Sequence, residues 1–270
     1  MKRAIKAGLH KVGLLNFGER VYFNLKSASP SVLWRQLQVK DNRGADGYPL
    51  PPPNLMYDVI ASRWQAVFLD SGQKVVDDMA AQLAQFGHPL QDFSSILDFG
   101  CGCGRLIRHV QKHTDAILTG SDYNASLIAW CQTHLSFASF SVNQLLPPFT
   151  FAPASFDFVY ARSVFTHLPA ETQEAWIAEL RRVMRPGGVL YLTMHGDRVA
   201  GGLTENQRTA MQRGELVVLY SSRAGENLCT TYAGKAYVEE KLCTGFDLLG
   251  FIPGRDEDHL RQDIYLLKKQ

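Results

Sequence analysis

The most constraining feature of the chain is a short segment in which three glycines alternate with other residues directly after an apolar run. It reads Ile-Leu-Asp-Phe-Gly-Cys-Gly-Cys-Gly over residues 96–104, and an amphipathic stretch containing Leu106, Ile107 and Val110 follows at once. This order predicts a strand, a tight loop and a helix. Glycine lets a ligand lie against main chain, and the unpaired amides at a helix start favour anionic groups. We therefore expect a nucleotide-like ligand over this loop.

The spacing of the glycines indicates which nucleotide is bound. The dinucleotide fingerprint requires Gly-x-Gly-x-x-Gly. Counted from Gly100, the position of the third glycine is occupied by Arg105, and counted from Gly102 it is occupied by Ile107. The observed pattern is acid-x-Gly-x-Gly-x-Gly, from Asp98 to Gly104. On this motif the sequence resembles the class I S-adenosylmethionine-dependent methyltransferases. The resemblance implies an α/β Rossmann-like fold whose seven-stranded sheet is mostly parallel, with an antiparallel last strand and helices on both faces.

Three further markers follow in the order of that family. Residues 117–122 form a second apolar run that ends in Asp122, roughly 20 residues past the loop, where such folds place a carboxylate on ribose hydroxyls. The alternative is that Asp122 caps the helix beginning near Ala125. Residues 155–169 resemble the fourth strand and the segment leaving it. Arg-Pro-Gly-Gly at 185–188 is predicted to end the next helix before a strand at 189–194.

The third strand, about 137–142, is followed by Asn143, where the family often has an acid that reads adenine. An amide can still hydrogen-bond a base, although without charge. Taken residue by residue, the resemblance implies cofactor contacts at Asp98, Gly100, Cys101, Gly102, Gly104, Asp122, Tyr123, Asn143, Leu145, Arg162 and Ser163.

Two histidines are candidates for the chemical step. The sulfonium of S-adenosylmethionine already activates its methyl group, so the protein must mainly orient a nucleophile. An alcohol must also lose its proton, and imidazole is a suitable base near neutral pH. His167 follows the fourth strand and His195 follows the fifth, so either could be that base, or could instead shape the pocket and bind main chain. Tyr160, Arg162 and Tyr232 are candidate pocket walls or packing residues.

The chain is predicted to contain an N-terminal helical extension or lid over residues 1–90 and a methyltransferase domain over 91–270. An insertion at about 196–244 carries an expected hairpin (216–220 with 229–232) and a helix near 236–243. It follows the fifth strand and so should face the substrate at the carboxyl edge of the sheet. Residues 245–251 and 263–267 are expected to close the sheet.

Composition narrows the functional classes. The chain has 270 residues, 46% hydrophobic, with a formal net charge of +2, which does not favour a nucleic-acid partner. Five cysteines, an odd number, favour free thiols in a reducing, cytoplasmic setting, and Cys101-x-Cys103 lacks the second pair that a zinc site needs. No apolar run could span a membrane. Residues 1–26 hold six basic residues against one acid, which suits membrane-surface contact or, preferably, a packed helix with solvated lysines.

The function expected from these features is methyl transfer from S-adenosyl-L-methionine to a hydroxyl of a sugar or other small molecule. The overall pattern, from the three prolines at 51–53 through residues 163–168 to Gln262 and Asp263, resembles bacterial methyltransferases of glycan or small-molecule tailoring. The segment after the fourth strand has no Asn-Pro-Pro-Tyr-type motif, which argues against adenine or glutamine N-methylation. Two alternatives remain, a non-catalytic cofactor-binding module and a nicotinamide-dependent oxidoreductase. The missing dinucleotide fingerprint argues against the second.

Overall fold

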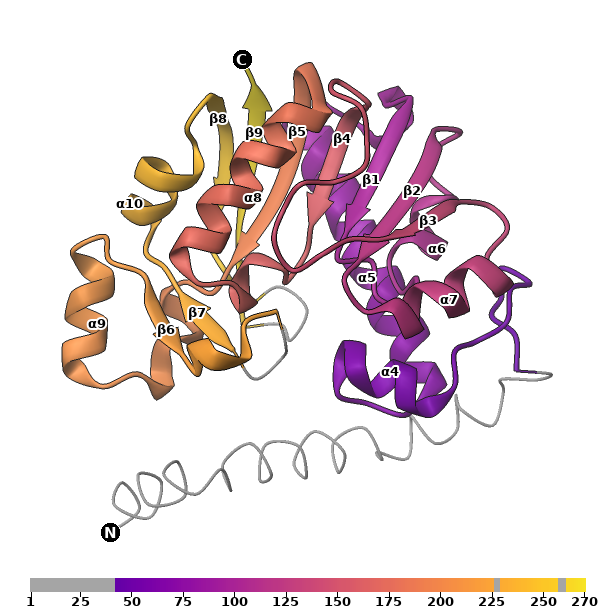
Figure 1. The fold of residues 1–270 in the computed structure, drawn as a ribbon, viewed down its shortest axis with the longest axis horizontal. Helices are drawn as coiled ribbons and strands as arrows, with labels where there is room; N and C mark the ends of the chain where they lie inside the picture. The colour runs from indigo at the N-terminus through magenta and orange to yellow at the C-terminus, as the bar shows by residue number, and fades with distance from the viewer. Residues whose placement is uncertain (1–41, 226–228, 257–260) are drawn as a thin grey trace, which may run out of the picture. The chain divides into compact units, whose positions relative to one another are not determined.

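The computed structural model describes residues 42–225, 229–256 and 261–270 (Figure 1). The chain divides into two compact units, Met1–Gly72 and Gln73–Gln270. The described part of the first unit holds helix α4 (Pro53–Ile60) and the start of α5 (Gln65–Gln85). The basic segment at residues 1–26 lies outside the described residues, and the extension ending at residue 90 stays a prediction. No helix of the described ranges is long and apolar enough to cross a membrane.

The second unit is built on a seven-stranded sheet in the order β3-β2-β1-β4-β5-β9-β8. Its strands are β1 (Ser95–Phe99), β2 (Ile117–Asp122), β3 (Ser139–Val142), β4 (Phe156–Ala161), β5 (Met184–Met194), β8 (Phe246–Ile252) and β9 (Asp263–Lys269). The pairs among β1 to β5 are parallel, whereas β9 runs antiparallel to both β5 and β8. The predicted fold class is confirmed. Because β9 reverses, its first residue lies at the carboxyl edge of the parallel strands.

Helices cover both faces of this sheet (Figure 1). Besides α5, the helices of this unit are α6 (Ile107–Val110), α7 (Ala125–His134), α8 (Ala170–Val183), α9 (Glu205–Gln212) and α10 (Lys235–Tyr237), with short turns η1 (Leu90–Asp92), η2 (Phe165–His167), η3 (Asp197–Gly202), η4 (Ser221–Arg223) and η5 (Val238–Leu242). Helix α9 does not cover this sheet but packs on the insertion, where Met211 lies against Val217. Helix α8 lies in front of β4 and β5 in the view of Figure 1. On the opposite face the hydroxyl of Tyr191 donates to Gln82 of α5, at 2.9 Å.

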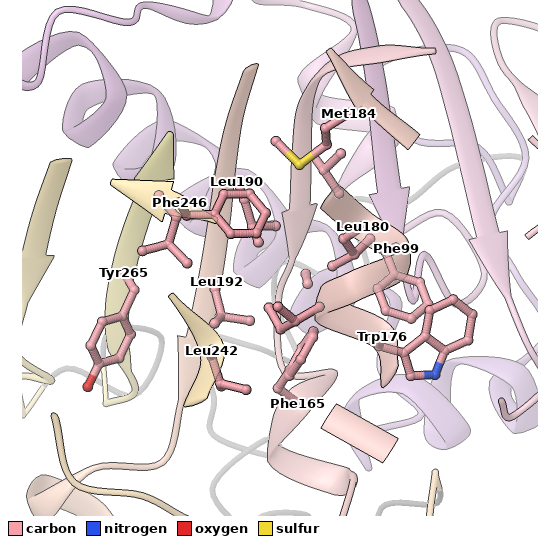
Figure 2. Close-up of a cluster of buried hydrophobic side chains, with 14 of the residues drawn as sticks. Phe99, Phe165, Trp176, Leu180, Met184, Leu190, Leu192, Leu242, Phe246 and Tyr265 are labelled. Carbon is pink, nitrogen blue, oxygen red and sulfur yellow. The ribbon is translucent and has the colours of Figure 1, made fainter. Parts of the chain in front are cut away.

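The main core lies between α8 and the sheet (Figure 2). Strand side chains alternate between faces, so Leu190 and Leu192 face α8 while Tyr191 between them faces α5. The indole ring of Trp176 is buried against Phe99, with ring centroids 4.6 Å apart. Its Nε1 donates to the carbonyl of Leu145, at 2.9 Å. Helix α8 therefore holds both the sheet and the loop that follows β3.

The insertion forms a small sheet of its own. Strands β6 (Val217–Leu219) and β7 (Thr230–Tyr232) pair antiparallel, which confirms the predicted hairpin. His195 directly follows β5, as predicted, and a bridge between His195 and Tyr232 joins β7 to this point of the chain. Because β5 ends at the carboxyl edge, the hairpin lies at that edge, as expected for a substrate-facing element.

The Arg-Pro-Gly-Gly segment differs from its prediction. It was expected to separate helix α8 from the next strand, but β5 begins at Met184, directly after α8. Met184 pairs with Phe156, and the next pair is Val189 with Phe158, so residues 185–188 form an irregular bulge inside one long strand. The bulge turns Arg185 back toward the sheet, where its Nη1 lies 3.2 Å from the Asp157 carboxylate. Proline and glycine therefore interrupt the pairing without ending the strand.

Candidate active site

The glycine loop connects β1 to the helix start as expected. Gly100, Gly102 and Gly104 have φ values of 79°, 56° and 78°, in the left-handed region that favours glycine. The amide of Gly100 donates to the carbonyl of Ser121 at the end of β2, at 2.7 Å. A Cβ added at Gly100 would lie 2.4 Å from Cγ2 of Val164. Both the backbone conformation and the packing therefore require glycine at this position.

Asp122 ties the glycine loop to the second strand. Its Oδ2 accepts from the amide of Gly102, at 2.9 Å, and its Oδ1 from the amide of Asn124, at 2.8 Å. The side chain that caps α7 is Asn124, which accepts from the amide of Ser126. The alternative of Asp122 as the helix cap is therefore wrong. Burial raises the pKa of the Asp122 carboxyl, and ribose binding by this group stays a prediction.

Asp98 is a second buried carboxyl, at the end of β1 and only 2% exposed. Burial, with a smaller contribution from the negative charge of Asp122, raises its pKa to about 7 against the opposing effects of Tyr160 and Arg105. Its Oδ2 has no hydrogen-bond partner within the described ranges. Two desolvated acids thus lie beside the glycine loop, and a cation bound there would stabilise their ionised forms.

The residues expected to contact adenine lie at the ends of β2 and β3. Asn143 is buried and uses its amide internally, since its Oδ1 accepts from Ser121 and its Nδ2 donates to the carbonyl of Gln144, at 2.8 and 2.7 Å. One lone pair and one hydrogen are left for a ligand. Tyr123 and Leu145 are 43% and 39% exposed, and they offer apolar surface at the same edge.

The cysteines of the loop point into the protein. Cys101 is 2% exposed, and a Cβ added at Gly120 would lie 2.9 Å from its Sγ. Cys101 can therefore offer a ligand only its main chain. Its Sγ and that of Cys131 both lie near the carbonyl of Gly102, at 3.6 and 3.5 Å. All five cysteines are free thiols, and the described ranges hold no cluster of metal-binding side chains.

A second polar cluster lies at the ends of β4 and β5. Ser163 has a φ of 61°, and its amide donates to Oγ1 of Thr193, at 2.9 Å. Gln262, just before β9, accepts from Thr193, from Ser163 and from the guanidinium of Arg162. Burial lowers the pKa of Arg162. The predicted cofactor residues Arg162 and Ser163 are thus brought together with residues next to His195.

The insertion fixes both candidate histidines. Nδ1 of His167 lies 2.6 Å from the carbonyl of Cys229, and Nδ1 of His195 lies 3.2 Å from that of Thr231. A carbonyl can only accept, so Nδ1 carries the proton in each ring and Nε2 carries the lone pair. The ring centroids are 6.4 Å apart. Burial lowers both pKa values, that of His195 to about 3, so both rings are neutral at pH 7.

The two histidines differ at Nε2. In His195 this atom lies 3.3 Å from the amide nitrogen of Gln262, whereas no described residue hydrogen-bonds to Nε2 of His167. The ring of Tyr232 packs on His195, with centroids 5.3 Å apart, and can form a pocket wall. Tyr160 is fully buried against Phe158, so it is a packing residue and not a wall.

A comparison with known families identifies this arrangement. Residues 96–188 match the family model described as "Methyltransferase domain". This segment matches a methyltransferase domain. The match spans the glycine loop, Asp122 and His167, and it ends at the bulge within β5.

Solved structures and curated relatives resemble the methyltransferase domain at low identity. A 1,6-didemethyltoxoflavin-N1-methyltransferase from Burkholderia thailandensis has a TM-score of 0.54 and 15% identity, over 82% of this chain and 92% of that one. A SAM-dependent methyltransferase from Methanosarcina mazei has a TM-score of 0.50 and 21% identity, over 66% and 93%. A sterol 24-C-methyltransferase of Gibberella zeae is 31% identical over 148 residues, which are 50% of this chain and 38% of the relative.

Sequence reasoning gave no site role to Gln262 or Thr193, nor to the two carbonyls of the insertion. Two signals could have identified the side chains. Thr193 stands next to the end of a predicted parallel strand, and Gln262 stands just before a strand expected to run antiparallel. Both positions fall at the carboxyl edge. The carbonyls carry no signal in the sequence, because every residue has one.

Proposed function

We propose that the chain is an S-adenosylmethionine-dependent methyltransferase acting on a hydroxyl of a small molecule, such as a sugar. One observation carries this proposal. A glycine loop flanked by two buried carboxyls, of Asp98 and Asp122, lies at the same sheet edge as a neutral histidine, His167, whose Nε2 is open. The first group suits a cationic nucleoside, and the second suits an acceptor that must lose a proton.

The residues present fit S-adenosylmethionine. When bound, this cofactor supplies a methyl group that its sulfonium activates. The desolvated carboxyls of Asp98 and Asp122 favour a cation, and the exposed apolar surfaces of Tyr123 and Leu145 suit a base. The other proposed contacts are those of the predicted set at Gly100, Cys101, Gly102, Gly104, Asn143, Arg162 and Ser163. Cys101 contributes main chain only, because its side chain points inward.

His167 is the proposed general base. Its Nε2 takes the proton of the acceptor hydroxyl while its Nδ1–H stays bonded to the carbonyl of Cys229. Burial lowers the pKa of the ring, so the base is unprotonated at pH 7 before the reaction. Such a base typically contributes about 10²–10⁴-fold to the rate. His195 is the less suitable candidate, because Gln262 already occupies its Nε2.

A carbon acceptor is the second candidate. It is favoured by the curated relatives named sterol 24-C-methyltransferase, of which the first covers 50% of this chain. A hydroxyl acceptor is favoured by the site, because an open imidazole lone pair is useful where a proton must be removed from oxygen. Incubation with labelled S-adenosylmethionine and two acceptor panels, alcohols and phenols against sterols with side-chain alkenes, separates the two by which panel gains the label.

The test of the base compares His167→Ala with a surface control, His113→Ala. His167→Ala should lower kcat by about 10²–10⁴-fold and leave cofactor affinity within about twofold, because the base acts on the acceptor. The wild-type rate should fall on the acidic side below pH 6.5, since the pKa of His167 is lowered. The variant should lack that limb, and His113→Ala should keep it. Full activity of His167→Ala with an unchanged pH profile would remove His167 as the base.

A further inference from the structure

We infer that Gln262 is a positioning residue that, together with the carbonyl of Thr231, fixes the tautomer of His195, keeps this ring uncharged and so excludes it as a second base. This inference deepens the proposed function and rests on it only for its catalytic meaning. The hydrogen-bond pattern itself belongs to the protein without any ligand.

The orientation of the Gln262 amide follows from its neighbours. Its Oε1 accepts from the hydroxyls of Thr193 and Ser163, at 2.7 and 3.0 Å. Hydroxyls could also accept, so they do not by themselves distinguish oxygen from nitrogen. The guanidinium of Arg162 does distinguish the two atoms, because it can only donate and it contacts the atom to which the hydroxyls are bonded. The atom facing Arg162 must therefore be the oxygen, and the amide nitrogen must face His195.

That orientation determines the state of His195. An amide nitrogen only donates, so Nε2 of His195, 3.3 Å away, must accept. The ring proton then resides on Nδ1, where the carbonyl of Thr231 accepts it. From Arg162 through Gln262 and His195 to Thr231, each group donates to the next. A proton added at Nε2 would place two donors face to face.

The surrounding charges act in the same direction. Burial lowers the pKa of His195, and the charges of Arg162 and Arg261 lower it further, as His167 does when its ring is protonated; only the hydrogen bond to Thr231 opposes them. A charged imidazole here would also repel a sulfonium bound at the same sheet edge. By holding Nε2 as an occupied acceptor, Gln262 keeps positive charge out of the site and leaves His167 as the ring with an open lone pair.

The antiparallel strand explains how so distant a residue reaches the site. Gln262 and Ser163 are 99 positions apart in the chain. Strand β9 begins at Asp263, which pairs with Met194, the last residue of β5. The residue before β9 therefore lies beside the ends of β4 and β5, where Arg162 and Thr193 are.

The experiment measures the imidazole nitrogens of the full chain by ¹⁵N NMR between pH 5 and 8, without ligand. The His195 signals are assigned by their loss in His195→Asn. Wild-type His195 should be neutral with the proton on Nδ1 throughout. Gln262→Glu keeps an oxygen for Arg162 but places a second carboxylate oxygen at His195. Nε2 should then take up a second proton while the carbonyl of Thr231 keeps that on Nδ1, so the ring should titrate within this range. The exposed Gln85→Glu should leave the His195 signals unchanged.

A second variant separates positioning from folding. Gln262→Met keeps the size of the side chain and removes all four hydrogen bonds of the amide. Nε2 of His195 then loses its donor while the carbonyl of Thr231 still accepts from Nδ1, so the Nε2 signal should shift to that of an unbonded acceptor. If this variant does not fold, Gln262→Glu decides, because its carboxylate can pair with Arg162. A His195 ring that stays neutral and Nδ1-protonated in Gln262→Glu would overturn the inference. The result is independent of turnover, so a chain that transfers no methyl group would fail the proposed function alone.

Discussion

Replacing Asp98 with asparagine should stabilise the ligand-free protein at and above neutral pH. The two side chains have nearly the same shape, but asparagine cannot ionise. Asp98 is 2% exposed, and burial raises its pKa from 3.8 to about 7. At about 1.36 kcal/mol per pH unit, that difference corresponds to about 4 kcal/mol. This is an upper value, because the asparagine amide must also be desolvated at the same position.

The effect should depend on pH with a definite sign. Between pH 3.8 and about 7 the unfolded chain has released the Asp98 proton while the folded chain retains it. The free energy of unfolding therefore falls as the pH rises through this interval. Below it Asp98 adds no cost, and above it the cost is complete. Asp98→Asn lacks this contribution, so its advantage should grow up to about pH 7 and then level off.

Urea unfolding at pH 5, 6, 7 and 8 measures the effect, with the exposed Asp92→Asn as a matched control. The difference between Asp98→Asn and wild type should increase from pH 5 to 7, and that of the control should not. Saturating S-adenosylmethionine should reduce the advantage, because its positive charge stabilises the ionised Asp98 carboxylate. A difference that stays constant from pH 5 to 8 would refute the assignment of a raised pKa to Asp98, and with it the argument for a cation site.

Two further substitutions test the glycine loop. Asp122→Ala should weaken S-adenosylmethionine binding by about 1–3 kcal/mol in calorimetry, because the amide of Gly102 loses its acceptor and the ribose loses a charged partner; undiminished affinity would contradict the ribose assignment. Gly100→Ala should lower the free energy of unfolding by about 1–3 kcal/mol, since its φ is 79° and the new Cβ meets Val164. Adding Val164→Ala should recover only the part due to the clash, so complete recovery would show that backbone strain adds nothing.

The fold could be predicted because its signals are local. Apolar runs bounded by glycine, proline and acids mark β1, β2, β4 and the closing pair β8 and β9, and the one antiparallel strand follows from the resemblance. The bulge at 185–188 could not be predicted, because proline and glycine are as common in a turn as in an irregular strand. Their effect depends on whether a neighbouring strand can pair on both sides of them, as β4 does.

Candidate site residues could be predicted where an ionisable side chain lies at or just after the end of a parallel strand. Asp98, Asp122 and His195 were found in this way, since such ends share one edge of the sheet. What each side chain does there depends on partners that are distant in the chain. The bond from Gly102 to Asp122 and that from Gln262 to His195 need the folded geometry, because no local pattern records which donor reaches which acceptor.

The two histidines are held by main-chain carbonyls at Cys229 and Thr231 of the insertion. A carbonyl is the same group whichever residue carries it, so the side chains of the hairpin can be exchanged without altering the direction in which either imidazole ring donates. The proposed function therefore assigns acceptor recognition to the side chains of the hairpin and the orientation of the base to its backbone. On this proposal, substitutions in the hairpin would change the acceptor and leave the orientation of His167 and His195 as it is.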